Sequence, residues 1–209
     1  MPNPVAPAVL TTLYASKSGQ KGRTLIAEAV RDVKEHHRLL ESGGYRPEGC
    51  PLCGRRLHIH DQRTRVLRDL AGSVTEELIC RYRCRSCRAV WQVLPGFIAR
   101  HLHRRWDVVQ RAVASLSAPE RTASEQGTRR QTSTLRRWYA RLASSALVLT
   151  QALSGVGATL GAVLMDVGAW CTRIELVDAL AQAGLVRKES KFNDLACWIH
   201  RATPGLRLI

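Results

Sequence analysis

The chain of 209 residues carries 32 Lys and Arg against 17 Asp and Glu, which gives a formal net charge of +15 and a sequence pI near 10.4. Hydrophobic residues make up 45% of the chain and charged residues 23%, which excludes a disordered basic tail. A folded basic protein attracts nucleic acid or an anionic membrane, and its charge argues against a site whose carboxylates bind acidic substrates. Residues 50–100 contribute +6 and residues 101–140 contribute +5 of the net charge. This distribution favours nucleic acid.

The N-terminal segment, residues 1–44, is predicted to be helical. Apolar residues recur at helical spacing between Leu25 and Leu40, and Ser42 with the two glycines after it ends the pattern. Residues 1–19 lack a basic region followed by a long apolar core, so no secretory signal is evident. We therefore expect a cytoplasmic protein associated with the bacterial nucleoid, in which the seven cysteines are metal ligands or buried thiols.

Residues 45–98 are predicted to form a zinc ribbon. There are two C-x-x-C pairs, Cys50 with Cys53 and Cys84 with Cys87, and Gly54 after the first pair allows the backbone to bend around a sulfur. Apolar and polar residues alternate around these pairs, which is typical of short strands. Four thiolates complete a closed tetrahedral site, so we expect one structural Zn²⁺ with no open position for a substrate.

Other roles are open to these cysteines besides zinc binding. A redox dithiol normally opens a helix within a βαβ pattern, which is absent here, and an iron–sulfur site would use the same four ligands. Cys80, His58 and His60 lie close enough in sequence to replace a ligand. Cys80 falls on the apolar side of its predicted strand with Leu78 and Tyr82, which favours a buried thiol.

Basic residues surround the second cysteine pair. Period-two alternation places three of them on one face of a strand, and such a stripe can follow phosphate groups or simply face solvent. The four are Arg81, Arg83, Arg85 and Arg88.

Residues 99–142 are predicted to form a helix-turn-helix. Apolar spacing over residues 106–116 predicts a first helix, and the capping-box pattern of residues 117–120 predicts a second, short helix that ends near Gly127. A third helix is predicted over about residues 132–142, with Trp138 in its apolar face. We expect the side chains at its start to contact DNA: Arg129, Arg130, Gln131, Thr132, Ser133, Thr134, Arg136 and Arg137.

Five short runs carry a family resemblance: CPLCG, YRCRSC, LPGF, ERTASEQG and TLRRWYARL. Together they resemble the zinc-ribbon and helix-turn-helix segment at the N-terminus of bacterial insertion-sequence transposases and of small bacterial proteins related to them. The resemblance covers about residues 45–142 and implies sequence-directed DNA binding, with the four paired cysteines as zinc ligands. Such transposases continue into a strand-rich catalytic domain with three metal-binding carboxylates. The segment after Leu142 is too short for such a domain, and its acids stand in helical patterns, so we expect no enzymatic activity.

The C-terminal region, residues 143–209, is predicted to be helical. Apolar residues recur at alternating intervals of four and three from Leu142 to Val167. This seam fits either a dimerisation helix or two helices packed on the rest of the domain, and we favour the second arrangement. Residues 142–165 carry no charge, but their polar residues and glycines argue against a membrane span.

The sequence thus predicts a mainly α fold with a small β zinc ribbon. The predicted function is sequence-directed DNA binding, as a transposon-derived accessory factor or a transcriptional regulator, with a possible homodimer and no small-molecule substrate. Two alternatives stay open: a protein–protein assembly factor that uses the ribbon and the apolar seam, and an RNA-binding zinc-ribbon protein.

Overall fold

The computed structural model of the protein describes residues 23–43, 45–117, 129–154, 158–167, 171–203 and 206–209. The chain divides into two compact units. The first contains the described residues up to Leu67 together with Thr75–His103, and the second contains Arg68–Val74 and Arg104–Ile209.

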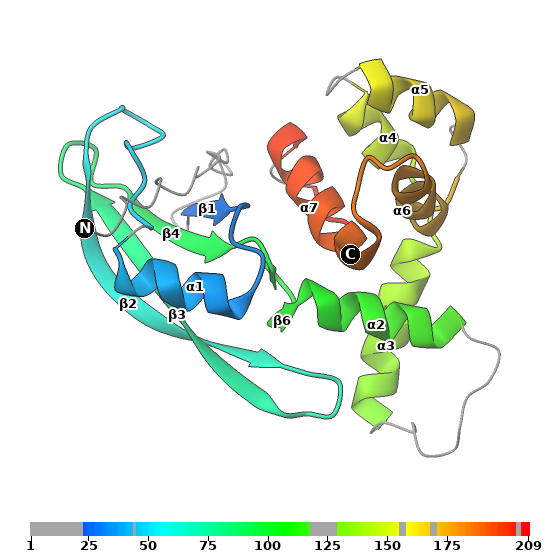
Figure 1. Ribbon diagram of the computed structural model, residues 1–209, viewed down its shortest axis with the longest axis horizontal. Coiled ribbons are helices and arrows are strands. Elements are labelled where there is room, and N and C mark those ends of the chain that lie inside the picture. The colour runs from blue at the N-terminus through cyan, green and yellow to red at the C-terminus, as the bar shows by residue number, and fades with distance from the viewer. Residues whose placement is uncertain (1–22, 44, 118–128, 155–157, 168–170, 204–205) are drawn as a thin grey trace, which may run out of the picture. The chain divides into compact units, whose positions relative to one another are not determined.

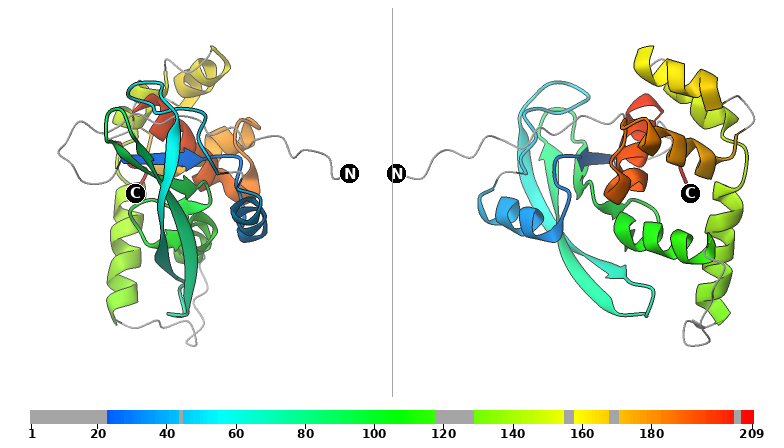
Figure 2. Two further views of the ribbon diagram at one scale, coloured as in Figure 1. Left: turned by 90° about the vertical axis from the view of Figure 1, so that its left-hand side faces the viewer. Right: turned by 45° about the vertical axis from the view of Figure 1, so that its right-hand side comes forward.

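The first unit is built on a four-stranded sheet (Figure 1). Its strands are β1 (Arg23–Ala27), β2 (Leu57–Arg68), β3 (Val74–Cys84) and β4 (Val90–Pro95), in the order β1-β4-β3-β2. Strand β1 pairs with β4 in parallel, and β3 pairs with β4 antiparallel, so the sheet is mixed. The long hairpin of β2 and β3 twists along its length (Figure 2). The short strand β5 (Ile98–Ala99) follows the sheet.

Helix α1 (Val33–Glu41) packs on this sheet and is shorter than expected. Asp32 caps its N-terminus by accepting a hydrogen bond from the Glu35 N–H at 2.8 Å, and Gly43 with a φ of +68° follows its end. The prediction of a helix beginning near Leu25 was wrong, because residues 23–27 form β1. A short apolar run suits a buried strand as well as a helix, and pairing with β4 decides between them.

The core of the first unit lies between the sheet and α1. Trp91, Leu25, Leu39 and Tyr45 are almost completely buried in it. The expected strict alternation along β3 was wrong, because Ile79 and Cys80 are both buried and Leu78 is 45% exposed. The burial pattern of β3 therefore changes phase at Cys80.

The predicted fold class was also wrong, because the protein has a mixed α/β fold and is not mainly α. Strands β2 and β3 contain 12 and 11 residues, far longer than the short strands expected around the cysteines. Strand β1 adds a parallel partner that lies outside the predicted ribbon. Long strands and a sheet partner drawn from the N-terminal segment make the β part a full sheet.

Beyond the hairpin tip at residues 68–74 and the short strand β6 (Arg104–Arg105), the regular elements of the second unit are helices. Contacts link α2 with α3 and α7, and link α6 with α5 and α7 (Figure 1). A capping box opens α6, with Thr172 and Glu175 exchanging hydrogen bonds. The helices are α2 (Trp106–Ser117), α3 (Arg129–Leu142), α4 (Leu147–Leu153), α5 (Ala158–Val167), α6 (Arg173–Gln182), the 3₁₀ helix η2 (Lys188–Ser190) and α7 (Lys191–Ala202).

The apolar seam does not form one continuous helix. Helix α3 ends at Leu142 and α4 begins at Leu147. Ser145, which lies between them, forms an isolated β-bridge with Thr172. Leu142, Leu149 and Leu153 are completely buried within the unit, as the packing arrangement predicts. Among the described residues, no helix is both long and apolar enough to cross a membrane.

Candidate metal centre and basic surface

The four paired cysteines meet at one end of the sheet. Cys50 and Cys53 lie in the loop before β2, Cys84 ends β3, and Cys87 lies in the turn before β4. The Sγ atoms of Cys50 and Cys87 are 3.5 Å apart, as are those of Cys53 and Cys84, and all four lie within 4.8 Å of one another. A tetrahedron with Zn–S bonds of about 2.3 Å has S–S edges of about 3.8 Å. The donor set therefore fits one zinc ion with four thiolate ligands.

The two cysteine pairs adopt the same backbone turn, which we call the first knuckle (residues 50–55) and the second knuckle (residues 84–89). In the first, the Cys50 N–H donates to the Arg55 carbonyl at 2.8 Å; in the second, the Cys84 N–H donates to the Ala89 carbonyl at 2.9 Å. The residue after each pair has a positive φ, +69° at Gly54 and +58° at Arg88. The two knuckles thus share their closing hydrogen bond and the positive φ after the second cysteine.

Each knuckle anchors one cysteine in the core. Cys50 and Cys84 are 2% and 0% exposed, whereas Cys53 and Cys87 are exposed. The backbone N–H of Cys87, together with the neighbouring thiols, lowers the pKa of Cys84, whereas, although the Ala89 N–H opposes the shift, burial and the neighbouring thiols raise the pKa of Cys87. Metal binding requires the thiolate form of each sulfur.

The alternative ligands lie outside this group. Cys80 is buried, with its Sγ 3.8 Å from the Gln62 amide nitrogen, and burial raises the pKa of Cys80. His58 is half-buried and His60 is exposed, and among the described residues only the four paired cysteines gather at metal-binding distance. Zinc binding by these four is thus compatible with the geometry.

The predicted arginine stripe divides into one paired and three unpaired side chains. Arg81 is bound by both carboxylate oxygens of Asp61 on β2, which neutralises its charge. Arg83, Arg85 and Arg88 are exposed and form no ion pair with any described acid.

Three further arginines that the sequence analysis overlooked join them. Arg46, Arg55 and Arg56 are also exposed and lack an ion pair with any described acid, although two of them directly follow the first cysteine pair and its glycine. Partial burial and then the charges of Arg85, Arg56 and Arg46 lower the pKa of His58, which locates these groups near one ring. We call the six residues the basic rim: Arg46, Arg55, Arg56, Arg83, Arg85 and Arg88.

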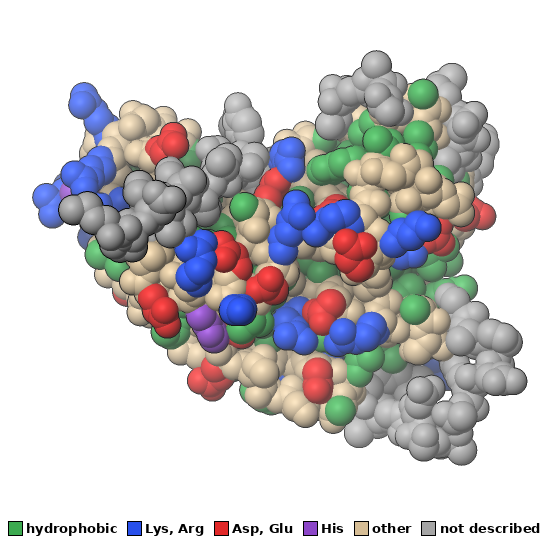
Figure 3. Space-filling model, in the orientation of Figure 1, with side chains coloured by type: hydrophobic (Ala, Val, Ile, Leu, Met, Phe, Trp, Pro, Cys, Tyr) green, Lys and Arg blue, Asp and Glu red, His purple; other side chains and the backbone are tan. Residues whose placement is uncertain are grey.

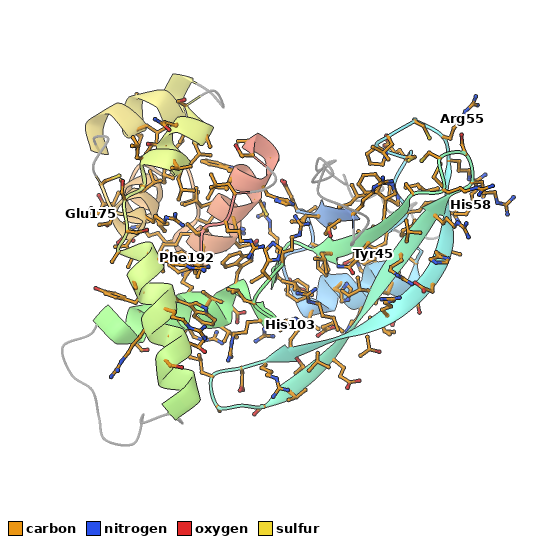
Figure 4. All side chains as sticks on the ribbon, turned by 180° about the vertical axis from the view of Figure 1, so that it is seen from behind. Tyr45, Arg55, His58, His103, Glu175 and Phe192 are labelled. Carbon is orange, nitrogen blue, oxygen red and sulfur yellow. The ribbon has the colours of Figure 1, made fainter. Side chains whose placement is uncertain are left out.

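The basic rim occupies the cysteine-bearing end of the first unit. Lys and Arg side chains stand out there in the space-filling view (Figure 3). Arg55 and His58 point outward from the same end of the sheet (Figure 4). Among the described residues, no ion pair would have to be displaced for an anionic partner to reach the basic rim.

The predicted DNA-reading helix is present as α3. It begins at Arg129, before the expected start near Thr132, and buries Trp138 and Leu142. Arg136, Arg137 and Ser133 are exposed, Thr134 is half-buried, and the Arg137 guanidinium donates to the Thr134 hydroxyl at 3.3 Å. The expected short helix between α2 and α3 and the side chains of residues 129–132 lie outside the described residues.

Arg104 links the hairpin tip, residues 68–74, to α3 within the second unit. Its guanidinium donates to the carbonyl of Arg68 at 3.0 Å and to that of Asp69, and it stacks 5.5 Å from the centre of the Trp138 ring. The sequence gives no sign of this contact, because Arg104 and Trp138 lie far apart along the chain.

A buried polar network lies beneath α1. The His36 ring nitrogen Nδ1 and the Tyr45 hydroxyl are 2.5 Å apart, and the His37 Nε2 is 3.0 Å from the Glu77 carboxylate. His36, Tyr45 and Glu77 are all buried. Burial lowers the pKa of His36, although the charge of Glu77 opposes the effect. This network joins α1 to β3 and was not predicted.

Comparison with known families adds one match. Residues 50–138 are similar to a family model described as "Domain of unknown function (DUF6431)". The matched segment begins at the first zinc-ligand candidate and ends at Trp138 on α3, so it includes both knuckles and α2. No curated protein and no solved structure matches the chain. The resemblance to insertion-sequence transposases stays a prediction.

Proposed function

We propose that the protein is a non-enzymatic, sequence-directed DNA-binding protein, either a regulator of transcription or an accessory factor derived from a transposon. One observation carries the proposal: six exposed arginines surround the four-cysteine site without an ion pair to any described acid. Exposed guanidinium groups of this kind bind phosphates in two-pronged geometry and release counterions from DNA. Zinc would hold the two knuckles together and so keep the rim in place.

The charge of the zinc site itself does not account for the rim. Zn²⁺ with four thiolates carries a formal charge of about −2, whereas the rim carries six positive charges. Most of that positive charge remains for an external anion. Because Arg81 is already neutralised by Asp61, we assign it a structural role between β2 and β3.

Helix α3 is the element that we propose reads base edges. Its exposed face carries Arg136, Arg137 and Ser133, which are side chains that bond guanine edges and phosphates. Its buried face is fixed to the unit by Trp138 and Leu142. A rigid helix with one polar basic face can enter a major groove.

Selection from a random pool of DNA duplexes by the zinc-loaded full chain tests the proposal. We expect one sequence to be enriched, and Arg136→Gln to change that sequence. In contrast, Arg55→Gln together with Arg56→Gln should weaken binding to all sequences alike, as phosphate contacts do. If no sequence is enriched and affinity disappears at moderate salt, the protein is not a sequence-directed DNA binder. Stronger enrichment from a matched RNA pool would assign it to RNA.

A further inference from the structure

The two knuckles share one backbone conformation but differ in the side chains that they carry. The first knuckle, Cys-Pro-Leu-Cys-Gly-Arg, has Pro51 and Gly54, residues that suit a tight turn. The second, Cys-Arg-Ser-Cys-Arg-Ala, has Arg85 and Arg88 at the equivalent positions. The first knuckle therefore carries turn-forming residues at these two positions, and the second carries arginines instead.

The departure at residue 88 strains the backbone. Arg88 has a φ of +58°, a left-handed conformation that glycine adopts freely and that a residue with a Cβ adopts only at a cost in stability. Gly54 holds the equivalent position with a φ of +69°. Glycine would therefore serve the second knuckle better than arginine if only the fold mattered.

No ion pair among the described residues offsets this strain. The Arg88 side chain is exposed and pairs with no described acid. Strained residues of this kind are concentrated at functional sites. The position is thus better explained by a ligand outside the chain than by packing.

We propose that the second knuckle is the phosphate-gripping turn of the protein, in which Arg88 and Arg85 contact consecutive backbone phosphates of duplex DNA. This assignment rests on the proposed DNA-binding function and goes beyond it by naming the turn and its principal contact. Arg88 extends from a turn whose two cysteines would be fixed by the metal, so its base is held rigidly. Rigid placement lowers the entropy lost when a long side chain binds.

One competing explanation is that Arg88 neutralises the thiolate cluster. A zinc tetrathiolate is anionic, and an arginine that directly follows a ligand could serve only to retain the metal. That role predicts weaker zinc retention after Arg88 is removed, whereas a phosphate contact predicts unchanged zinc retention and weaker DNA binding. The two explanations therefore differ in a measurable quantity.

The experiment compares Arg88→Gly, Arg88→Lys and the wild type as zinc-loaded full chains. Arg38→Gln is the matched control, because Arg38 is exposed on α1 and already paired with Glu35. Three quantities are measured for each: the thermal midpoint, zinc loss to a competing chelator, and affinity for a short DNA duplex over a range of salt concentrations.

We expect Arg88→Gly to raise the thermal midpoint by roughly 2–4 °C, because strain is relieved, and to lose zinc at the wild-type rate. Its DNA affinity should fall roughly tenfold, and the slope of log K against log salt should become less steep by about 0.9. Arg88→Lys should keep most of the slope, since it keeps the charge. Arg38→Gln should leave affinity and slope unchanged.

Two results would overturn the assignment: wild-type DNA affinity in Arg88→Gly, or faster zinc loss from that variant. Failure of the proposed function has a different signature, since the wild type itself would then show no measurable binding to duplex DNA even at the lowest salt concentration.

Discussion

Replacing Cys84 by Ser should remove zinc from the protein. Cys84 is completely buried, and its Sγ lies 3.5 Å from that of Cys53, so the hydroxyl oxygen would occupy the ligand position with a far weaker donor. Structural zinc sites bind with about 10–16 kcal/mol, so one of four equal ligands contributes about 2.5–4 kcal/mol. Zinc affinity should therefore fall by roughly 100- to 1000-fold.

Metal analysis after dialysis against a chelator measures this loss. The wild type should retain one zinc per chain, and Cys84→Ser should retain none. Cys80→Ser is the control, because Cys80 is also a buried β3 thiol and lies outside the ligand group. One zinc per chain in Cys84→Ser, or loss of zinc from Cys80→Ser, would refute the four-ligand assignment.

Three further changes test the packing around the site. Tyr45→Phe leaves the buried Nδ1 of His36 without its partner and should lower the free energy of unfolding by about 2 kcal/mol; wild-type stability in urea would contradict this. Burial lowers the pKa of His36 below its ordinary 6.5, so the unfolded chain binds the proton first. The free energy of unfolding should therefore be highest above pH 6.5 and should decline as the pH falls through the lower pKa that His36 has in the folded chain. His36→Phe should reduce that decline. Gly49→Ala would place a Cβ 2.8 Å from the Gly54 carbonyl oxygen and should weaken zinc retention; unchanged retention would argue against a tight first knuckle.

The cluster of four cysteines could be predicted from sequence because the spacing within each pair is a local property. Each pair lies within one turn, and Gly54 marks where the backbone reverses. The equivalent conformation of Arg88 was missed, because arginine gives no local sign of a positive φ. Only the folded backbone, in which the two knuckles share one closing hydrogen bond and a positive φ at Gly54 and Arg88, reveals it.

The sheet could not be predicted fully because its pairings are distant in sequence. Strand β1 is fixed by β4, whose Trp91 lies opposite Arg23 although the two are far apart along the chain. Glu77 is buried on β3 because His37 of α1 binds its carboxylate across 40 residues. Apolar patterns in a short window contain neither partner, so the N-terminal strand was read as helix and β3 was given too regular an alternation.

The central claim, that the protein binds one DNA sequence in preference to others, is tested most directly by a salt titration of the full chain. Binding is measured on the selected duplex and on a scrambled duplex of equal composition. We expect log K to fall with a slope of about −5 on both duplexes, as six phosphate contacts imply, while the selected duplex stays at least about 1000-fold preferred. If the selected and scrambled duplexes bind with equal affinity at every salt concentration, the protein binds polyanions through charge alone and the claim is wrong.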